Sequence, residues 1–334
     1  MNKYLLLLIS SFLYFSSIHG QYKKYTYYAD KMGSPLTITI GATKNNLDSV
    51  QCTQLAQKAL QLIDSLNHIL SDYDSTSELS IINQQAGNGF MPISPTLEEI
   101  LLIAQKAYYQ TNGAYNIAIG PLSTLWRNAR KTKIFPTKLE IKNALNKITF
   151  NQILIDSIHH QIYLPKKLMR LDLGSLGKGF VAQKTLNYLQ SNGIEYAMID
   201  AGGKIACLAP NNLHWNIGIN ELREKNKTIP IVLKLQNQAI ATSGDLYQFF
   251  IHNGHRYSHI INPKTGYGIE IPKNVTVIAQ NGVTADWLST ACSILPIQEA
   301  IQLVAKYHAE ILIAIQKGES IQYYKSKGFD AFLN

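Results

Sequence analysis

The chain has 334 residues, of which 46% are hydrophobic and 16% are charged, enough to bury the core of one large domain or two tightly joined lobes. Its formal net charge is +9, from 31 basic and 22 acidic residues. The basic residues are scattered and no run of five or more Lys or Arg occurs, which argues against nucleic-acid binding. A basic surface instead suits a phosphorylated small molecule, although solubility alone would also explain it.

The N-terminal segment has the pattern of a secretory signal peptide. Lys3 precedes the apolar run YLLLLISSFLYF, and the small and polar run SSIHG follows it. A positive start, an apolar stretch of about 7–15 residues and a small-residue end are typical of such signals. The apolar run is short for a membrane span, which needs about 20 residues. We expect cleavage after Gly20 and an exported mature protein; an uncleaved N-terminal anchor is the alternative.

The first part of the mature chain is predicted to be mainly helical. The segment LTITI (36–40) alternates like a half-buried strand. The apolar stripe of a long helix follows and comprises Ala56, Ala59, Leu60, Ile63, Leu66 and Leu70. A second helix opens with Ser94 and Pro95, has an acidic first turn and ends near Gly113. Its buried face is predicted to comprise Leu97, Ile100, Leu101, Ala104 and Tyr108.

From about residue 150 the pattern changes to short strands. Segments 153–155 and 162–164 flank a turn and predict a hairpin, and a helix is expected to follow Lys178 and to end at Asn192. Further strands are predicted at 196–200, 215–219, 231–235 and 275–279, helices at 284–295 and 297–307, and a last hairpin at 311–315 and 321–324. Long helices followed by hairpin-linked strands predict an α+β fold. The three cysteines, Cys52, Cys207 and Cys292, lack metal or redox spacing and indicate core positions.

Two glycine-rich segments carry polar groups that could serve a site. LDLGSLGKGF (171–180) places Asp172 at a predicted strand end, then a tight turn, then Lys178 at a helix start. Glycines allow a ligand to approach the backbone, and a helix N-terminus favours phosphate. The spacing matches neither the Walker loop nor the dinucleotide fingerprint, so an ordinary turn is the alternative. In GAYNIAIGPL (113–122), Tyr115 and Asn116 look exposed, but the segment alone also fits a loop around a core aromatic.

Two later segments also allow both a structural and a functional interpretation. AIATSGD (239–245) predicts a strand that enters a turn, where Ser243 or Asp245 would cap a helix. RYSHIINPKTG (256–266) predicts a strand that runs into an Asn-Pro turn. It places His259 among apolar neighbours, where a histidine is commonly a buried core residue.

The segment TADWLSTA (284–291) places a carboxylate one helical turn before a hydroxyl. Thr284 would cap the helix and Asp286 would complement its dipole. Alternatively, Asp286 and Thr290 lie on one helix face and could together hold a hard cation. No HExxH, CxxC or G-x-S-x-G motif occurs, so the chain gives no support to zinc, thiol-redox or serine-hydrolase chemistry.

Taken together and in this order, the segments resemble the family of periplasmic FAD:protein FMN transferases, the ApbE family. The resemblance runs from Met32 to about Ile315. The matching pieces are MGS (32–34), LSDYDSTSELSIIN (70–83), GAYNIAIGPLSTLW (113–126), LDLGSLGKGF (171–180), IDAGG (199–203), AIATSGD (239–245), YSHIINPKTG (257–266) and ADWLSTA (285–291). Each piece is modest by itself, but eight pieces in register are specific.

The resemblance implies both a fold and a reaction. A single catalytic domain over residues 21–334 would bind FAD in a cleft between two sheet-and-helix lobes. With Mg²⁺ it would transfer the FMN half to a threonine or serine hydroxyl of an acceptor protein, and AMP would leave. The implied acceptor is a subunit of a membrane-bound redox complex. The implied location is the periplasm or the outer face of the cytoplasmic membrane, with membrane contact through the acceptor or an uncleaved N-terminus.

The resemblance also implies the site residues. The family's flavin contacts correspond to Met32, Tyr73, Ala114, Tyr115, Asn116, Asp172, Lys178 and Ile260. Its metal ligands correspond to the main-chain carbonyl of Ser175 and the side chains of Asp286 and Thr290. Mg²⁺ prefers such oxygen ligands and leaves room for phosphates. We expect Lys178 to neutralise leaving-group charge. We expect His259, with the ordinary imidazole pKa of about 6.5, to accept the proton of the incoming hydroxyl.

The chain departs from the family pattern at Asn116 and Asn262, where the family has Asp usually or often, and at Ser175, where Gly or Ala is commoner. The two amides leave less negative charge around the cofactor. Two other functions stay open: an Mg²⁺-dependent FAD pyrophosphatase, in which water replaces the acceptor hydroxyl, and a flavin carrier without turnover. Asp286, Thr290 and Lys178 argue against the carrier, because storage needs no metal-held pyrophosphate.

Overall fold

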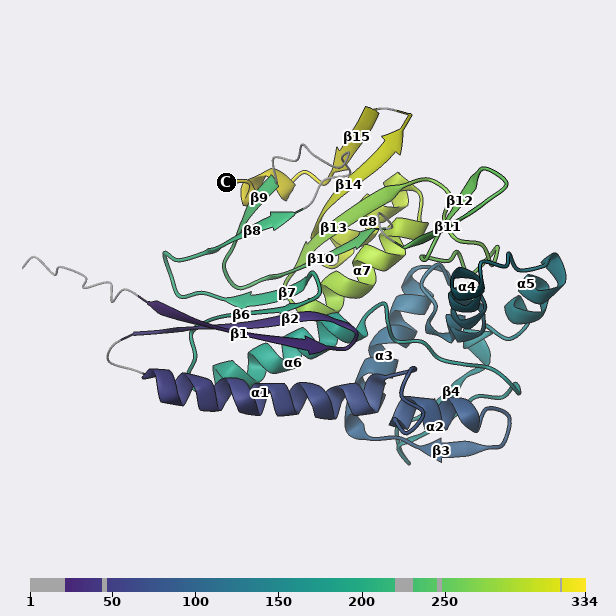
Figure 1. Ribbon diagram of the computed structural model, residues 1–334, viewed down its shortest axis with the longest axis horizontal. Helices are drawn as coiled ribbons and strands as arrows, with labels where there is room; N and C mark the ends of the chain where they lie inside the picture. The colour runs from purple at the N-terminus through teal and green to yellow at the C-terminus, as the bar shows by residue number, and fades with distance from the viewer. Residues whose placement is uncertain (1–21, 44–46, 220–230, 245–247, 319) are drawn as a thin grey trace, which may run out of the picture.

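A computed structural model describes residues 22–334 apart from 44–46, 220–230, 245–247 and 319. At its centre lies an eight-stranded sheet in the order β1-β2-β6-β7-β10-β13-β14-β15, in which every neighbouring pair is antiparallel (Figure 1). Its strands are β1 (Lys23–Lys31), β2 (Ser34–Ala42), β6 (Tyr196–Ala201), β7 (Lys204–Leu208), β10 (Ala239–Gly244), β13 (Lys273–Ala279), β14 (Glu310–Lys317) and β15 (Ser320–Lys325). The predicted α+β class is confirmed.

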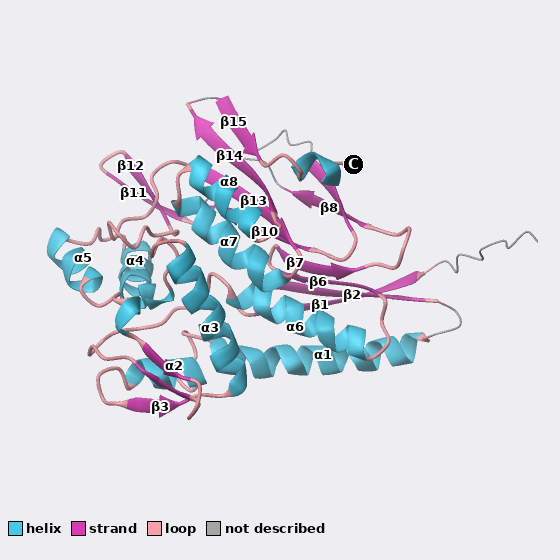
Figure 2. Cartoon of the chain, turned by 180° about the vertical axis from the view of Figure 1, so that it is seen from behind, coloured by secondary structure: helices cyan, strands magenta, loops and turns pink. Residues whose placement is uncertain are grey.

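Four helices cover one face of this sheet, as the two opposite views in Figures 1 and 2 show. They are α1 (Ser49–Leu70), α6 (Gly177–Ser191), α7 (Gly282–Ile294) and α8 (Ile297–Lys306). The hairpin of β8 (Trp215–Ile219) and β9 (Ile231–Leu235) packs on the other face. Successive side chains of a strand point to opposite faces of the sheet. Ala241 of β10 therefore belongs to the core beneath the helices, whereas Ile240 belongs to the cluster with the β8–β9 hairpin.

A second, smaller lobe follows α1 and carries most of the remaining elements. Its helices are α2 (Glu78–Gln84), α3 (Pro95–Gln110), η1 (Ile117–Ile119), α4 (Gly120–Thr132), α5 (Lys138–Leu145) and η2 (Phe150–Gln152). A three-stranded sheet contains β3 (Phe90–Pro92), β4 (Leu154–Asp156) and β5 (Gln161–Tyr163), and a separate hairpin contains β11 (Phe249–His252) and β12 (His255–Ser258). The chain ends in η3 (Phe329–Phe332).

Local sequence signals set the two long helices as predicted. Asp48 begins α1 with a capping box shared with Gln51, and Ser94 caps α3 directly before Pro95. The predicted apolar stripes are buried, except that Leu60 and Tyr108 are only partly buried. The three cysteines are free and buried, as expected of core residues.

Two local predictions are wrong. Segment 171–173 is not a strand: the backbone of Leu171 makes hydrogen bonds at both its N–H and its C=O to the side-chain amide of Asn83, and the N–H of Asp172 bonds to Ile117. Tertiary partners therefore replace a neighbouring strand. Thr284 does not cap α7 either, because Asn281 begins the helix and its side chain accepts a hydrogen bond from the Thr284 N–H.

The predicted signal segment, residues 1–20, lies outside the described residues. Within the part of the chain that is described, no helix is both long enough and apolar enough to cross a bilayer.

A buried lysine fixes the C-terminal end of α7. Lys273 on β13 donates hydrogen bonds from Nζ to the carbonyls of Cys292 (2.8 Å), Ser293 (3.3 Å) and Leu295 (3.2 Å). The last carbonyls of a helix carry partial negative charge, so an ammonium group is well placed there. Burial lowers the pKa of Lys273 to about 8, and the nearby thiol of Cys292 opposes this shift.

Replacement of Lys273 by methionine should remove a pH dependence of stability. Between the folded pKa of about 8 and the usual lysine value of about 10.4, the unfolded chain binds more protons, so stability rises with pH in this window. We expect the free energy of unfolding of the unmodified protein to rise by about 3 kcal/mol relative to Lys273→Met from pH 7.5 to 10.5. Urea unfolding at each pH measures this free energy, and Lys264→Met, at an exposed lysine, is the control. A difference between the unmodified protein and Lys273→Met that stays constant across this pH range would contradict the lowered pKa of Lys273.

Candidate active site

One cavity of about 940 Å³ lies between the two lobes, a size suited to a cofactor. It is lined by residues from distant parts of the chain. All twelve predicted site residues line it: Met32, Tyr73, Ala114, Tyr115, Asn116, Asp172, Ser175, Lys178, His259, Ile260, Asp286 and Thr290. The fold therefore brings together every residue that the sequence singled out for the site.

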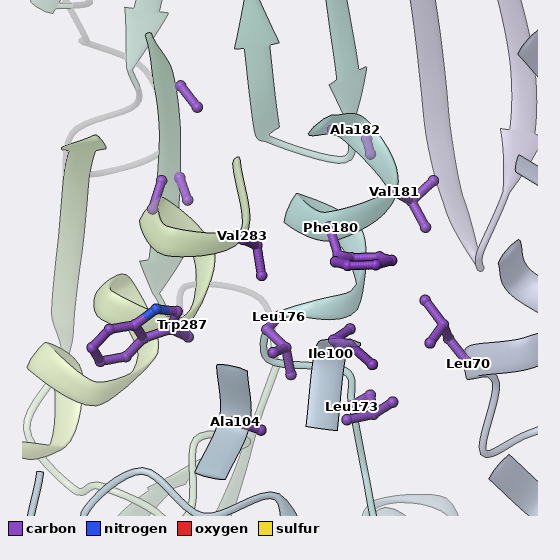
Figure 3. Packing of buried hydrophobic residues seen from close by; sticks show 14 of the residues in the cluster. Leu70, Ile100, Ala104, Leu173, Leu176, Phe180, Val181, Ala182, Val283 and Trp287 are labelled. Carbon is purple, nitrogen blue, oxygen red and sulfur yellow. The ribbon is translucent and has the colours of Figure 1, made fainter. Parts of the chain in front are cut away.

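The glycine-rich turn on the cavity wall is held by apolar anchors. Leu173 and Leu176 are buried, and Phe180 on the first turn of α6 is buried beside them. Figure 3 shows these side chains gathered with Ile100 of α3 and Val283 of α7 in one apolar cluster. Packing of these buried side chains therefore fixes the turn, and its backbone and Lys178 face the cavity.

The first turns of α6 and α7 meet without intervening side chains. A Cβ atom at Gly179 would overlap the carbonyl oxygen of Gly282 and would lie 2.6 Å from Cβ of Asp286. A Cβ atom at Gly282 would overlap the carbonyl oxygen of Gly179 in turn. This close approach lets the main-chain N–H of Gly179 donate a 2.9 Å hydrogen bond to Oδ2 of Asp286. Only glycine fits at either position without a shift of the backbone.

Asp286 is the least satisfied buried charge in the site. The residue is fully buried (0% exposed), and its Oδ1 makes no hydrogen bond to any described residue. The nearest cation is Nζ of Lys204, which lies 3.5 Å from Oδ1, longer than a good hydrogen bond. Burial raises the pKa of Asp286, and Lys204 is the strongest opposing influence. An orphaned, buried carboxylate oxygen on a cavity wall fits a bound cation.

The other predicted metal ligands lie on the same wall. Thr290 is one turn after Asp286 on α7, and its Oγ1 is 3.2 Å from Oγ of Ser243. The hydroxyl of Ser175 donates to the hydroxyl of Tyr115 at 2.9 Å, so the main-chain carbonyl is the group of Ser175 left for a ligand role. Across the described ranges, no group of three or more His, Cys, Asp or Glu side chains is arranged to hold a metal. The fitting donors are mixed oxygens around a single carboxylate, a set typical of Mg²⁺.

The sequence predicts a helix cap at Ser243 or Asp245. Ser243 caps no helix, because it lies within β10, and its Oγ is 2.6 Å from Oγ of Ser289 on α7. Ser243 therefore joins the sheet to the helix that carries Asp286. Asp245, the other proposed cap, lies outside the described residues.

Two ammonium groups stand in the cavity near Asp286. Lys178 is the second residue of α6, and Lys204 begins β7 after the IDAGG segment. Burial is the largest cause that lowers the pKa of Lys178, Lys204 adds to it, and Asp286 opposes it. Two partly buried cations beside a helix N-terminus favour a phosphate-bearing ligand. Lys204 was not predicted, although it directly follows the matched IDAGG segment and could have been found there.

An arginine-centred cluster lines another part of the cavity wall and was also not predicted. Arg127 on α4 donates from Nη1 to Oδ2 of Asp72 at 2.7 Å and from Nη2 to Asp172. Asp172 also accepts hydrogen bonds from Ser123 (2.7 Å) and from the N–H of Gly174 (2.9 Å). Burial and then Asp172 raise the pKa of Asp72, while Arg127 lowers it. Asp172 is thus paired and fixed, and it orients the glycine-rich turn as well as lining the cavity.

Tyr73 gives this wall an aromatic surface. The residue is 78% exposed, and its ring centroid lies 4.3 Å from the guanidinium carbon of Arg127. A ring held by a cation on one side offers its other side for stacking with a planar group. Arg130, also on α4, lines the same cavity, and burial followed by the charge of Arg127 lowers its pKa.

In the GAYN segment, the side chain of Tyr115 is buried, contrary to the exposed position expected for it. Tyr115 is only 1% exposed, its ring packs edge-on against Trp287 at 5.8 Å, and burial raises its pKa well above the usual value. Asn116 accepts a hydrogen bond from the N–H of Ala118 (2.8 Å) and donates one to the carbonyl of Ile148 (3.0 Å). An aspartate could make the first bond but not the second.

His259 lies at the edge of the cavity after β12 and is not a core histidine, since it is partly exposed. Its main-chain N–H donates to the carbonyl of Gln248 at 2.9 Å, and Nδ1 lies 3.2 Å from the same oxygen. This contact favours the tautomer with its proton on Nδ1 and leaves Nε2 as the basic nitrogen. Asn262 shapes the following turn, where its Oδ1 accepts from the N–H of Lys264 at 2.9 Å.

Comparisons with known proteins identify the family of the chain. The family model described as "ApbE family" matches residues 32–313. An FAD:protein FMN transferase of Vibrio cholerae is 29% identical over 308 residues, 89% of this chain and 91% of the relative. One of Klebsiella pneumoniae is 28% identical over 267 residues, 80% of this chain and 81% of the relative. The solved flavin transferase ApbE from Vibrio cholerae superposes with a TM-score of 0.84 at 26% identity, covering 94% of this chain and 100% of its own.

Substitution of Gly179 by alanine should test the contact between α6 and α7. The added methyl group would overlap the Gly282 carbonyl, so we expect a loss of about 1–3 kcal/mol in the free energy of unfolding. Gly177→Ala, two residues earlier in α6, is the matched control, because a Cβ atom there meets only Met32 Cε at 4.0 Å. Chemical denaturation of both variants measures the difference. Equal stability of the two variants would show that the close approach is not needed.

Proposed function

The chain belongs to the ApbE family, and we propose that it is an Mg²⁺-dependent FAD:protein FMN transferase. It moves FMN from FAD to a threonine or serine hydroxyl of an acceptor protein and releases AMP. The observation that carries this proposal is the buried, orphaned Oδ1 of Asp286, which faces a cavity with two ammonium groups and lies on the wall shared with the glycine-rich turn. A cavity built only for an apolar ligand would not bury such a carboxylate.

The donors that would hold Mg²⁺ are the Asp286 carboxylate, the Thr290 hydroxyl and the Ser175 carbonyl. These hard oxygen donors suit Mg²⁺ and leave positions for phosphate oxygens. When bound, the ion supplies positive charge that stabilises the negative charge developing on the pyrophosphate.

The lysines complete the binding of the pyrophosphate. Lys178, at the N-terminus of α6, and Lys204 place two positive charges beside Asp286, where the phosphates of FAD would lie. Positive charge there lowers the energy of the transition state in phosphoryl transfer and stabilises the AMP phosphate as it leaves. Tyr73 and the GAYN segment supply the surface for the planar flavin.

The reaction exchanges one phosphorus–oxygen bond for another. The acceptor hydroxyl oxygen attacks the phosphorus on the FMN side of the pyrophosphate, the bond to the bridging oxygen breaks, and AMP departs with that oxygen. The hydroxyl proton passes to Nε2 of His259, the general base in this scheme. His259 lies at the cavity edge, where a protein substrate can reach it.

Asp286→Asn should separate catalysis from folding. Asparagine keeps an acceptor for the Gly179 N–H, so we expect a stability change within about 1 kcal/mol. Loss of the negative charge should weaken the hold on Mg²⁺ and lower AMP release from saturating FAD at least about a hundredfold. Thr290→Val removes a neutral ligand and should have a smaller effect, partly rescued by raised Mg²⁺.

The matched control is Asp64→Asn, which removes an exposed carboxylate paired with Lys31 at 2.6 Å. AMP release and flavin fluorescence of the acceptor band are measured together, with thermal melting of each variant. Normal turnover in a well-folded Asp286→Asn protein would end the metal-site proposal. FMN and AMP without a labelled acceptor would instead indicate a pyrophosphatase.

We expect the protein to work outside the cytoplasm, with a membrane redox subunit as the acceptor. The support is the Lys3-led apolar run and the small-residue end at Gly20. Mass spectrometry of protein isolated from cells should find Gln21 as the N-terminal residue. Retention of residues 1–20 in the exported protein would contradict cleavage and leave the anchored form.

A further inference from the structure

The β11 strand begins at the cavity and has an open edge. It directly follows Gln248, which lines the cavity, and pairs with β12 in a two-stranded sheet. Among the described residues, no second strand pairs with β11. The other edge of β12 is occupied, because the Ser258 N–H donates to the carbonyl of Ile269 at 2.9 Å.

The register shows which main-chain groups face outward. Antiparallel strands alternate between hydrogen-bonded and non-hydrogen-bonded pairs. His259 donates to Gln248, so this pair is hydrogen-bonded, whereas Ser258, the partner of Phe249, turns its N–H away from β11. The same alternation makes the pair of Ile251 and Arg256 non-hydrogen-bonded. The N–H and C=O groups of Phe249 and Ile251 therefore point to the outer edge.

The side chains on one face of this edge are apolar and exposed. Phe249 is 38% exposed and Ile251 is 63% exposed, and the Arg256 guanidinium lies 4.3 Å from the Phe249 ring centroid on the same face. The opposite face is packed, since Tyr257 stacks on Trp126 of α4 at 5.5 Å. An open strand edge flanked by exposed apolar side chains is a ready template for a partner strand.

We propose that the outer edge of β11 binds an extended segment of the acceptor protein as an added strand and leads its hydroxyl residue to Gln248 and His259. The inference rests on the proposed function and identifies how that function recognises its protein substrate. Strand addition provides affinity through main-chain hydrogen bonds and specificity through alternate side chains. Gln248 is three residues from Ile251, about 10 Å along a strand, so the contacts and the reacting hydroxyl belong to one short segment.

The chemistry of the edge specifies the segment. Apolar side chains at alternate positions on one side of the hydroxyl residue would pack on Phe249 and Ile251. The net charge, +9 for the full sequence, favours an acidic partner overall. The expected ligand is thus an extended, acidic segment with alternating apolar residues and one Thr or Ser.

Ile251→Pro tests the edge with little disturbance of the hairpin. Proline removes an outward N–H and no bond to β12, and edge strands tolerate it. Ile251→Val, which keeps the N–H and a β-branched side chain, is the matched control. The probe is a pool of peptides of about ten residues with one central Thr, made in an acidic and a basic set and offered with FAD and Mg²⁺.

We expect labelling of the acidic set, with enrichment of apolar residues at alternate positions. Ile251→Pro should lower labelling at least about tenfold while FAD binding stays within about twofold, and Ile251→Val should label normally. Hydrogen exchange of segment 248–252 in the unmodified protein should slow when the acidic set is added.

Labelling by Ile251→Pro equal to that of the unmodified protein, or unchanged exchange in 248–252, would overturn the inference and leave the transferase function standing. If Ile251→Pro does not fold, the exchange measurement on the unmodified protein decides alone. A dimer that Ile251→Pro converts to a monomer in light scattering would assign the edge to a second copy and overturn the inference. A protein that binds FAD but releases no AMP with any acceptor would refute the proposed function and, with it, this inference.

Discussion

The site depends on the direct contact between the first turns of α6 and α7. Because Gly179 and Gly282 carry no side chains, the two helix starts approach until the carboxylate of Asp286 reaches the N–H of Gly179. Both helix N-termini carry partial positive charge, and the carboxylate between them offsets part of the repulsion. The apolar anchors below the glycine-rich turn and the Lys273 cap at the far end of α7 hold this arrangement in place. The position of the orphaned oxygen is thus a result of backbone packing.

Charge divides the lining of the cavity into two parts with different roles. On one part, Arg127 bridges Asp72 and Asp172, and Arg170 lies 3.9 Å from Asp72, so these buried carboxylates are paired and mainly fix the loops that carry them. On the other, Asp286 faces Lys204 at 3.5 Å without a full hydrogen bond at Oδ1. A buried charge that the protein leaves partly unpaired is free to interact with a ligand, whereas a fully paired one is not. In the proposed function, the part of the lining that carries Asp286 is therefore the one that would act on the ligand.

Local patterns predicted the elements well because their causes are local. The stripe of α1 and the Ser94 cap of α3 follow from spacing alone. Asp172 was placed on a strand because its neighbours are apolar, but its segment bonds to Asn83 and Ile117, far away in the chain. Arg127 was missed for the same reason: its partners are 55 and 45 positions away, and no local period marks them. Single residues of the site came from the family resemblance, and their mutual geometry needed the fold.

Asn116 and Asn262, where the family resemblance leads to an expected aspartate, have local roles in the structure. Asn116 donates to the Ile148 carbonyl, a bond that an ionised aspartate cannot make, and Asn262 builds the turn after His259. Both amides therefore keep their loops in place without adding negative charge to the cavity. With Asp72 and Asp172 paired to Arg127, Asp286 is the buried carboxylate of the site that competes with an anionic ligand for the charge of the lysines. In the proposed function, fewer carboxylates would favour the binding of the FAD phosphates and would make the binding of Mg²⁺ depend more strongly on Asp286.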